Sequence, residues 1–119
     1  MPESSPQTTA GKPSVERRLF RRLRARGAAS FRPADKPMAT GIPIVLLDIS
    51  HGGVGFTVAR QLTAGQLLII DMQSPMGSAR PLSLEAEVRW TLPTAKPGQL
   101  RVGCAWLHRL EFADLQRFT

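Results

Sequence analysis

Among its 119 residues the sequence has a single cysteine, no tyrosine and no long apolar run. One cysteine, Cys104, cannot form an internal disulfide, which excludes a disulfide-stapled fold. The longest apolar runs, at 44–47 and 67–70, are far too short to span a bilayer. The first residues are polar and lack the apolar segment of a signal peptide. We therefore expect a cytoplasmic protein without a membrane span.

Signatures of catalysis are also scarce. His51 and His108 stand alone in the sequence, and no paired cysteines or acidic cluster have metal-ligand spacing. Neither a GxSxG nucleophile motif nor a GxxxxGK[ST] phosphate loop is present. Ser50 has no sequence reason to lie beside a histidine, and Cys104 alternates with apolar neighbours, as a buried and inert thiol does. We expect neither an enzyme nor a resident metal or cofactor.

The positive charge is gathered in one segment. Residues 1–36 carry nine Lys and Arg against three acids, a balance of +6, whereas residues 37–119 carry seven against six, a balance of +1. Such a confined positive potential indicates an anionic partner: a phosphate ligand, a nucleic acid or an anionic membrane surface. Residues 1–15 are rich in Ser, Thr and Pro, and we expect them to be a disordered tail before one folded domain at 16–119.

The rest of the chain is typical of short strands separated by Gly and Pro. Over residues 82–91 apolar and polar side chains alternate, the period of a strand with one buried face. In this alternation Trp90 and Trp106 share the apolar phase and are expected in the core. Strands without intervening helices indicate an all-β antiparallel barrel or sandwich. The predicted strands are 24–31, 42–49, 54–59, 66–72, 82–91 and 100–108, and a short helix is predicted over 109–118 from Leu110, Leu115 and Phe118.

Two segments could bind a ligand. The first has six Arg in residues 17–26, and guanidinium groups can hold phosphate, bind the O6/N7 edge of guanine and stack on bases. The same run is also typical of a solvated basic tail, or of a basic amphipathic helix with Val15, Leu19 and Leu23 on one face.

The second segment, Asp48-Ile49-Ser50-His51-Gly52-Gly53, connects two predicted strands. Its acid and serine can accept hydrogen bonds from nearby N–H groups, so the segment can be no more than a well-formed turn. As a binding site, it would offer the Asp48 carboxylate to the N1–H and N2–H₂ edge of a guanine, with glycines that let a ligand approach the backbone.

Together the two segments resemble the PilZ domain family. The resemblance extends through Val54-Gly55-Phe56 and a closing strand at 102–107, so that it covers about residues 16–119. It implies a six-stranded antiparallel β-barrel with a short C-terminal helix and a flexible basic N-terminal arm. The Arg-x-x-x-Arg motif is matched within Glu16-Arg17-Arg18-Leu19-Phe20-Arg21-Arg22, and Asp-x-Ser-x-x-Gly by Asp48, Ser50 and Gly53.

The resemblance also implies a function. Such a protein would be a receptor for cyclic di-GMP that changes conformation on binding and signals through an unidentified protein partner. The implied ligand-binding residues are Arg17, Arg18, Arg22, Asp48, Ser50 and Gly53. Arg17/Arg21 and Arg22/Arg26 share the motif spacing, so the register stays open. One ligand or a stacked pair could bind, with Arg17 helping to hold the second, whereas His51 is expected to be an exposed turn residue.

Other functions than cyclic di-GMP binding stay open. A small basic barrel could bind nucleic acid, but such modules carry aromatic platforms on an exposed sheet face, and here both tryptophans are predicted to be buried. A membrane-surface role for the basic segment is weakened by Glu16 and by the short apolar stripe. Degenerate PilZ-like barrels that bind no nucleotide usually lack one of the two motifs, and both are intact here.

Overall fold

The computed structural model describes residues 22–75 and 81–119. The predicted tail at 1–15 lies outside these residues, as do Arg17 and Arg18. Within the described ranges the chain forms seven strands and a short helix: β1 Leu23–Arg24, β2 Ala28–Pro33, β3 Ile42–Ile49, β4 Gly53–Val58, β5 Leu67–Gln73, β6 Leu82–Pro93, β7 Leu100–Trp106 and α2 Phe112–Arg117.

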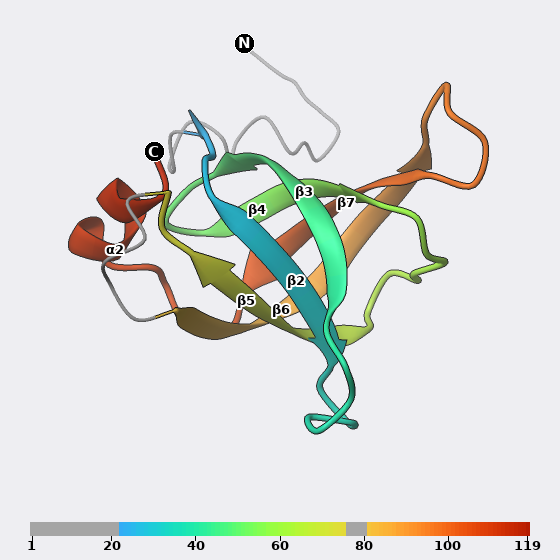
Figure 1. Cartoon of the computed structure of the whole chain (residues 1–119), viewed down its shortest axis with the longest axis horizontal. Helices are drawn as coiled ribbons and strands as arrows, with labels where there is room; N and C mark the ends of the chain where they lie inside the picture. Colours follow the sequence, from blue (N-terminus) through green and yellow to red (C-terminus); the bar gives the residue numbers. More distant parts are fainter. Residues whose placement is uncertain (1–21, 76–80) are drawn as a thin grey trace, which may run out of the picture.

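Six of these strands close into an antiparallel barrel (Figure 1). Their order is β3-β2-β5-β6-β7-β4, and β4 returns to pair with β3. The two-residue β1 lies beside the C-terminal end of β3, where Leu23 pairs with Ile49 and Arg24 with Asp48. The predicted six-stranded antiparallel barrel with a short C-terminal helix is thus confirmed.

The predicted strand at 24–31 is divided in two, and Gly27 is the reason. Its φ is 110°, a conformation that glycine adopts without steric penalty. A β-carbon at this position would lie 2.3 Å from the Gln73 carbonyl oxygen, so a larger residue would clash with β5. The other predicted strands are present with ends shifted by at most two residues.

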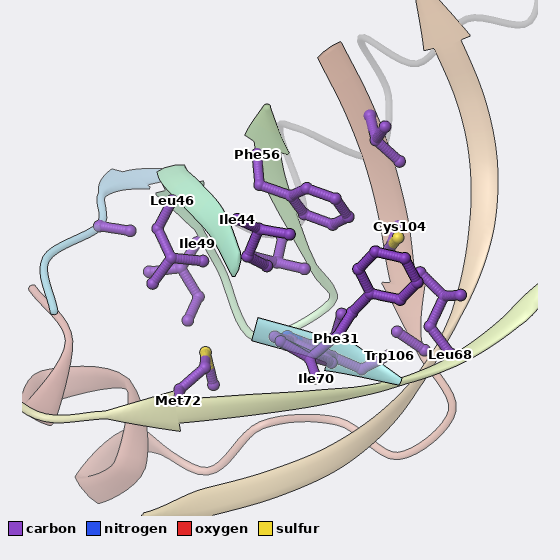
Figure 2. Packing of buried hydrophobic residues seen from close by; sticks show 14 of the residues in the cluster. Phe31, Ile44, Leu46, Ile49, Phe56, Leu68, Ile70, Met72, Cys104 and Trp106 are labelled. Carbon is purple, nitrogen blue, oxygen red and sulfur yellow. The ribbon is translucent and has the colours of Figure 1, made fainter. Parts of the chain in front are cut away.

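The barrel encloses one apolar core, closed at one end by the C-terminal segment (Figures 1 and 2). Phe31 and Phe56 are 2% and 0% exposed, and Phe118, just after α2, is 0% exposed. The Phe118 carbonyl accepts a 2.6 Å hydrogen bond from the Arg26 N–H, which joins this segment to the turn after β1. The predicted helix therefore covers the barrel end as expected, although Phe112 on its outer side is exposed. No helix of the described residues is long and apolar enough to cross a membrane.

Candidate functional site

Two β-bulges turn Asp48 and Trp90 onto the outside of the barrel. Along β3 the side chains of Ile44 and Leu46 point inward, and the pairing with β4 then shifts register before Asp48. Along β6 the inward alternation runs to Val88, and the pairing with β7 shifts before Trp90. An extra residue in one strand of a pair reverses the alternation beyond it, so that both side chains face outward.

The expectation that Trp90 lies in the core is therefore wrong. Trp90 is half-buried and pairs with Gly103 on the outer face, whereas Trp106 is buried as predicted. A β-carbon on Gly103 would lie 2.2 Å from the Trp90 ring, so the indole rests directly on the β7 backbone. The barrel wall thus carries an outward aromatic ring that the alternation of residues 82–91 concealed.

Asp48 and Trp90 lie at the two ends of one line across the sheet. Asp48 pairs with Gly55 of β4, Gly55 with Gly103 of β7, and Gly103 with Trp90. A β-carbon on Gly55 would lie 2.9 Å from a carboxylate oxygen of Asp48, so the carboxylate covers one glycine as the indole covers the other. We call these four residues the Asp48–Trp90 row.

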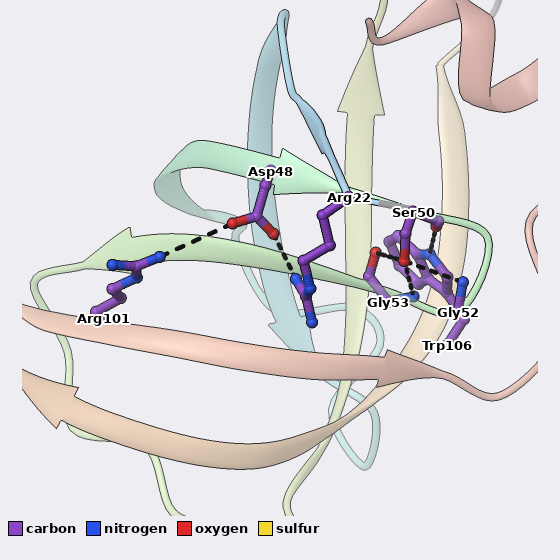
Figure 3. Close-up of polar contacts among 7 residues, drawn as sticks. All are labelled: Arg22, Asp48, Ser50, Gly52, Gly53, Arg101 and Trp106. Carbon is purple, nitrogen blue, oxygen red and sulfur yellow. Dashed lines mark hydrogen bonds and ion pairs between the residues drawn. The ribbon is translucent and has the colours of Figure 1, made fainter. Parts of the chain in front are cut away.

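Three arginines gather around the Asp48 end of this row, and Figure 3 shows two of them, Arg22 and Arg101. Arg22 donates a hydrogen bond to Oδ1 of Asp48, and Nη2 of Arg101 lies 3.9 Å from Oδ2. Arg24 pairs with Asp48 in the β1–β3 ladder and is exposed. Three guanidinium groups and one carboxylate leave a local charge of +2.

Of the residues predicted to bind ligand, the structure brings together Arg22 and Asp48, and the sequence reasoning missed Arg24, Arg101 and Trp90. Arg101 occupies an outward position of the predicted strand 100–108, but its proximity to Asp48 depends on the pairing of β7 with β4. The sequence offers only the alternation of apolar and polar residues here. This alternation shows on which face of a strand a side chain lies, but not which strand lies beside it.

Ser50 shapes the loop between β3 and β4. It is 3% exposed, and its Oγ accepts hydrogen bonds from the N–H groups of Gly52 and Gly53, at 3.2 and 3.1 Å. The Trp106 indole N–H donates to the Ser50 carbonyl at 3.1 Å (Figure 3). A β-carbon on Gly53 would lie 2.2 Å from the Cys104 carbonyl oxygen, so this position requires glycine. These contacts match the turn interpretation, and ligand-binding roles for Ser50 and Gly53 stay predictions.

His51 ties the same loop to the C-terminal segment. Its Nδ1 lies 2.6 Å from the Leu110 carbonyl oxygen, and its own carbonyl accepts a 2.9 Å hydrogen bond from the Leu110 N–H. The imidazole stacks on Phe112 with ring centroids 6.5 Å apart. His51 is thus a half-buried anchor, and the expectation of a simple exposed turn residue is wrong.

The structure agrees with the predicted character of Cys104. The side chain is buried, and this burial raises the pKa of the thiol to about 12. A thiol that stays protonated at neutral pH is a poor nucleophile. In the described ranges, no group of three His, Cys, Asp or Glu residues could hold a metal ion.

Comparisons with known proteins give matches over most of the chain. A family model described as the PilZ domain matches residues 16–119. The Bacillus subtilis inhibitor of motility MotI/DgrA is similar in structure, with a TM-score of 0.64 and 21% identity over 84% of this chain and 46% of that one. MrkH of K. pneumonia in complex with c-di-GMP is similar too, with a TM-score of 0.54 and 13% identity over 82% of this chain and 46% of MrkH. The chain spans less than half of each protein, and no curated protein matches it.

Proposed function

The chain belongs to the PilZ domain family, and from that premise we propose that it is a receptor for cyclic di-GMP that signals by changing its interaction with another protein. The observation that carries this proposal is the Asp48–Trp90 row with its three arginines. The MrkH relative, whose structure is a complex with c-di-GMP, supports the same ligand class. No catalytic step is part of this proposed function.

Asp48 is suited to bind one guanine. A carboxylate presents two acceptor oxygens side by side, which matches the neighbouring N1–H and N2–H₂ donors of a guanine edge. The Asp48 side chain is 23% exposed and lies on the outer surface, so that a ligand can reach it. Its oxygens face Arg22 and Arg101, and a bound guanine would replace these partners.

Trp90 offers a surface for a second base. Stacking of a base on an aromatic ring contributes about 1–3 kcal/mol. The carboxylate lies over Gly55 and the indole over Gly103, and these two glycines pair directly, about 5 Å apart. A base stacked on the indole would therefore lie close to a guanine held by Asp48, so that one ligand could contact both groups.

The arginines match the charge of this ligand. Cyclic di-GMP carries two phosphates, and the group of Arg22, Arg24, Arg101 and Asp48 has a net charge of +2. Exposed ion pairs contribute only about 0–1 kcal/mol, so Arg22 and Arg101 can exchange Asp48 for phosphate at little cost. After the exchange, Arg22 and Arg101 would each pair with a phosphate, and Asp48 would accept hydrogen bonds from the guanine.

The signalling step is proposed to involve the basic arm. Arg22 lies beside Asp48, which supports both registers that contain it, Arg18/Arg22 and Arg22/Arg26. Arg17 and Arg18 precede the described residues, and their closing over the bound ligand remains part of the proposal. A ligand that binds the closed form more tightly shifts the population toward it and presents a new surface to a partner.

Isothermal titration calorimetry with cyclic di-GMP tests the proposal, with cyclic GMP, GTP and single-stranded RNA as comparison ligands. We expect binding confined to the cyclic dinucleotide and weakened at least about tenfold in Arg22→Ala, Asp48→Ala and Trp90→Ala. The matched controls Arg60→Ala and Asp35→Ala alter exposed residues outside the row and should bind as the wild type does. Binding of RNA with similar affinity would instead support the nucleic-acid module, and absence of any binding would make the chain a degenerate barrel.

A further inference from the structure

A second part of the outer wall combines aliphatic and acidic side chains. On strands β5, β6 and β7, Leu67 pairs with Glu87, which pairs with Ala105, and Ile69 pairs with Glu85. The Leu107 N–H donates a 3.0 Å hydrogen bond to the Glu85 carbonyl, so Leu107 extends the line that Ile69 and Glu85 form across the sheet. Leu67 and Leu107 are 44% and 43% exposed. We call these residues the β5–β7 face: Leu67, Ile69, Glu85, Glu87, Ala105 and Leu107.

The β5–β7 face lies within the sheet and not at an edge. β5 pairs with β2 and β6, β6 with β5 and β7, and β7 with β6 and β4. The backbone groups of these strands are therefore engaged in the ladders, and a partner can add no strand here. Recognition of this face has to proceed through side chains.

The two glutamates of this face lack strong partners in the described part of the chain. Asp71 on the same wall accepts two 2.8 Å hydrogen bonds from Arg32. Glu87, in contrast, has only an exposed contact with Arg89 at 3.9 Å, and Glu85 has no ion-pair partner among the described residues. Their carboxylates project from one face of β6 at a spacing of about 7 Å, in a chain whose net charge is +7.

The other exposed large apolar residues are arranged differently. Met38 lies in the β2–β3 loop, and Phe112 on α2 is stacked against His51. Val45 on β3 and Leu92 on β6 are exposed too, but Thr57 and Arg101 lie between them on β4 and β7. On the β5–β7 face, four aliphatic residues flank the two glutamates on both sides, from β5 and from β7. Exposed apolar groups that are gathered and bordered by charge are typical of interaction sites.

We propose that the β5–β7 face binds a basic amphipathic segment of a partner protein. Leucine or isoleucine side chains of that segment would contact Leu67, Ile69 and Leu107. A Lys or Arg between them would be shared by Glu85 and Glu87, which relieves the repulsion between these two neighbouring carboxylates. This inference does not depend on nucleotide binding.

The position of the face would connect such a partner to the nucleotide row. Ala105 pairs with Gly53, so one line of the sheet runs from the β5–β7 face to the loop after Asp48. Any free-energy coupling between the two sites would be reciprocal: the partner would change ligand affinity by the same factor by which the ligand changes partner affinity.

An NMR titration of the full chain with a synthetic amphipathic peptide of leucine and lysine at helical spacing tests the proposal. We expect amide shifts concentrated in residues 66–70, 84–88 and 104–108, and none from a peptide with glutamate in place of lysine. Glu85→Lys with Glu87→Lys should weaken binding at least about tenfold. Asp35→Lys with Glu111→Lys makes the same change in net charge at exposed residues and is the matched control.

Results other than those expected above would overturn the proposal. Shifts confined to the arginines around Asp48, or no binding at about 1 mM peptide, would show that the face does not select this chemistry. An equal loss in the control pair would show that only overall charge matters. Glu85→Gln with Glu87→Gln, a milder change that keeps side-chain size, should also weaken binding, and it covers the case in which the lysine variant misfolds.

Discussion

The Trp90 indole rests on Gly103, at a place where a β-carbon would lie 2.2 Å from the ring. A glycine on β7 is thus what allows a tryptophan on β6 to lie against the wall of the barrel instead of projecting from it. Because an indole held in this way already has few orientations, stacking a base on it costs little side-chain conformational entropy.

Gly103→Val should therefore impair nucleotide binding, although Gly103 has no side chain of its own to contact the ligand. The new side chain displaces the indole, and we expect the affinity for cyclic di-GMP to fall by about 1–3 kcal/mol, the contribution of one base stack. Calorimetry measures the loss, and Ala105→Val, two residues further along the same face of β7, is the control. Unchanged affinity in Gly103→Val would show that Trp90 is not a stacking surface.

Trp106→Phe should loosen the β3–β4 loop. The substitution removes the indole donor of the 3.1 Å hydrogen bond to Ser50 and leaves a buried carbonyl without it. We expect a loss of about 1–3 kcal/mol in the free energy of unfolding, with faster hydrogen exchange at Gly52 and Gly53. Trp90→Phe, at a half-exposed site, provides the comparison and should destabilise less. Equal effects of the two variants would contradict the anchoring role of Trp106.

Phe118→Ala should destabilise the protein strongly. The ring is fully buried at the closed end of the barrel, and removal of a buried Phe side chain costs about 3–5 kcal/mol. Phe112→Ala, in the same segment but 63% exposed, should change stability by no more than about 0.5 kcal/mol. Urea unfolding of both variants measures the difference. If the two losses were similar, the C-terminal segment would not be packed as described.

Asp71 should make stability depend on pH in the acid range. Burial acts to raise the pKa of Asp71, but hydrogen bonds from Arg32 and Ser83 outweigh it, and the pKa lies below its ordinary value. A carboxylate with a lowered pKa in the folded state stabilises the protein above its unfolded pKa of about 4, and this contribution is lost as the pH falls through the folded pKa. Asp71→Asn should be less stable than the wild type at pH 7, and the difference should shrink as the medium is acidified. Urea unfolding at several pH values tests this, and a difference independent of pH would contradict it.

Much of the fold could be predicted from the alternation of apolar and polar residues and from the positions of Gly and Pro between the strands. Residues 42–49 form β3 with the predicted bounds, and Leu110, Leu115 and Phe118 are buried as their spacing indicated. The sequence predicts a single strand at 24–31, because the φ angle of the glycine within it cannot be read from the sequence. The close approach of β5, which requires Gly27, is a tertiary contact.

The candidate site was less predictable. The motif residues Arg22 and Asp48 could be identified and lie together. The alternation predicts the wrong face for Trp90, because a bulge changes the phase of a strand without altering the alternation of residue types. Arg101 could not be connected with Asp48, since strand order and register, rather than the pattern of either segment, bring them to one face.

The anchoring of the β3–β4 loop has a consequence for how the protein is made on the ribosome. The carbonyls of His51 and Gly52 accept hydrogen bonds from the N–H groups of Leu110 and Trp106, which leave the ribosome much later. Chains grow from the N-terminus at about 5–20 residues per second, so the loop after Asp48 waits several seconds for these donors. A nascent chain that has emerged only to residue 100 could form the hydrogen bonds within the loop, from the N–H groups of Gly52 and Gly53 to Ser50, but not those from residues 106 and 110. The loop would therefore be anchored only after the last strand and the helix arrive.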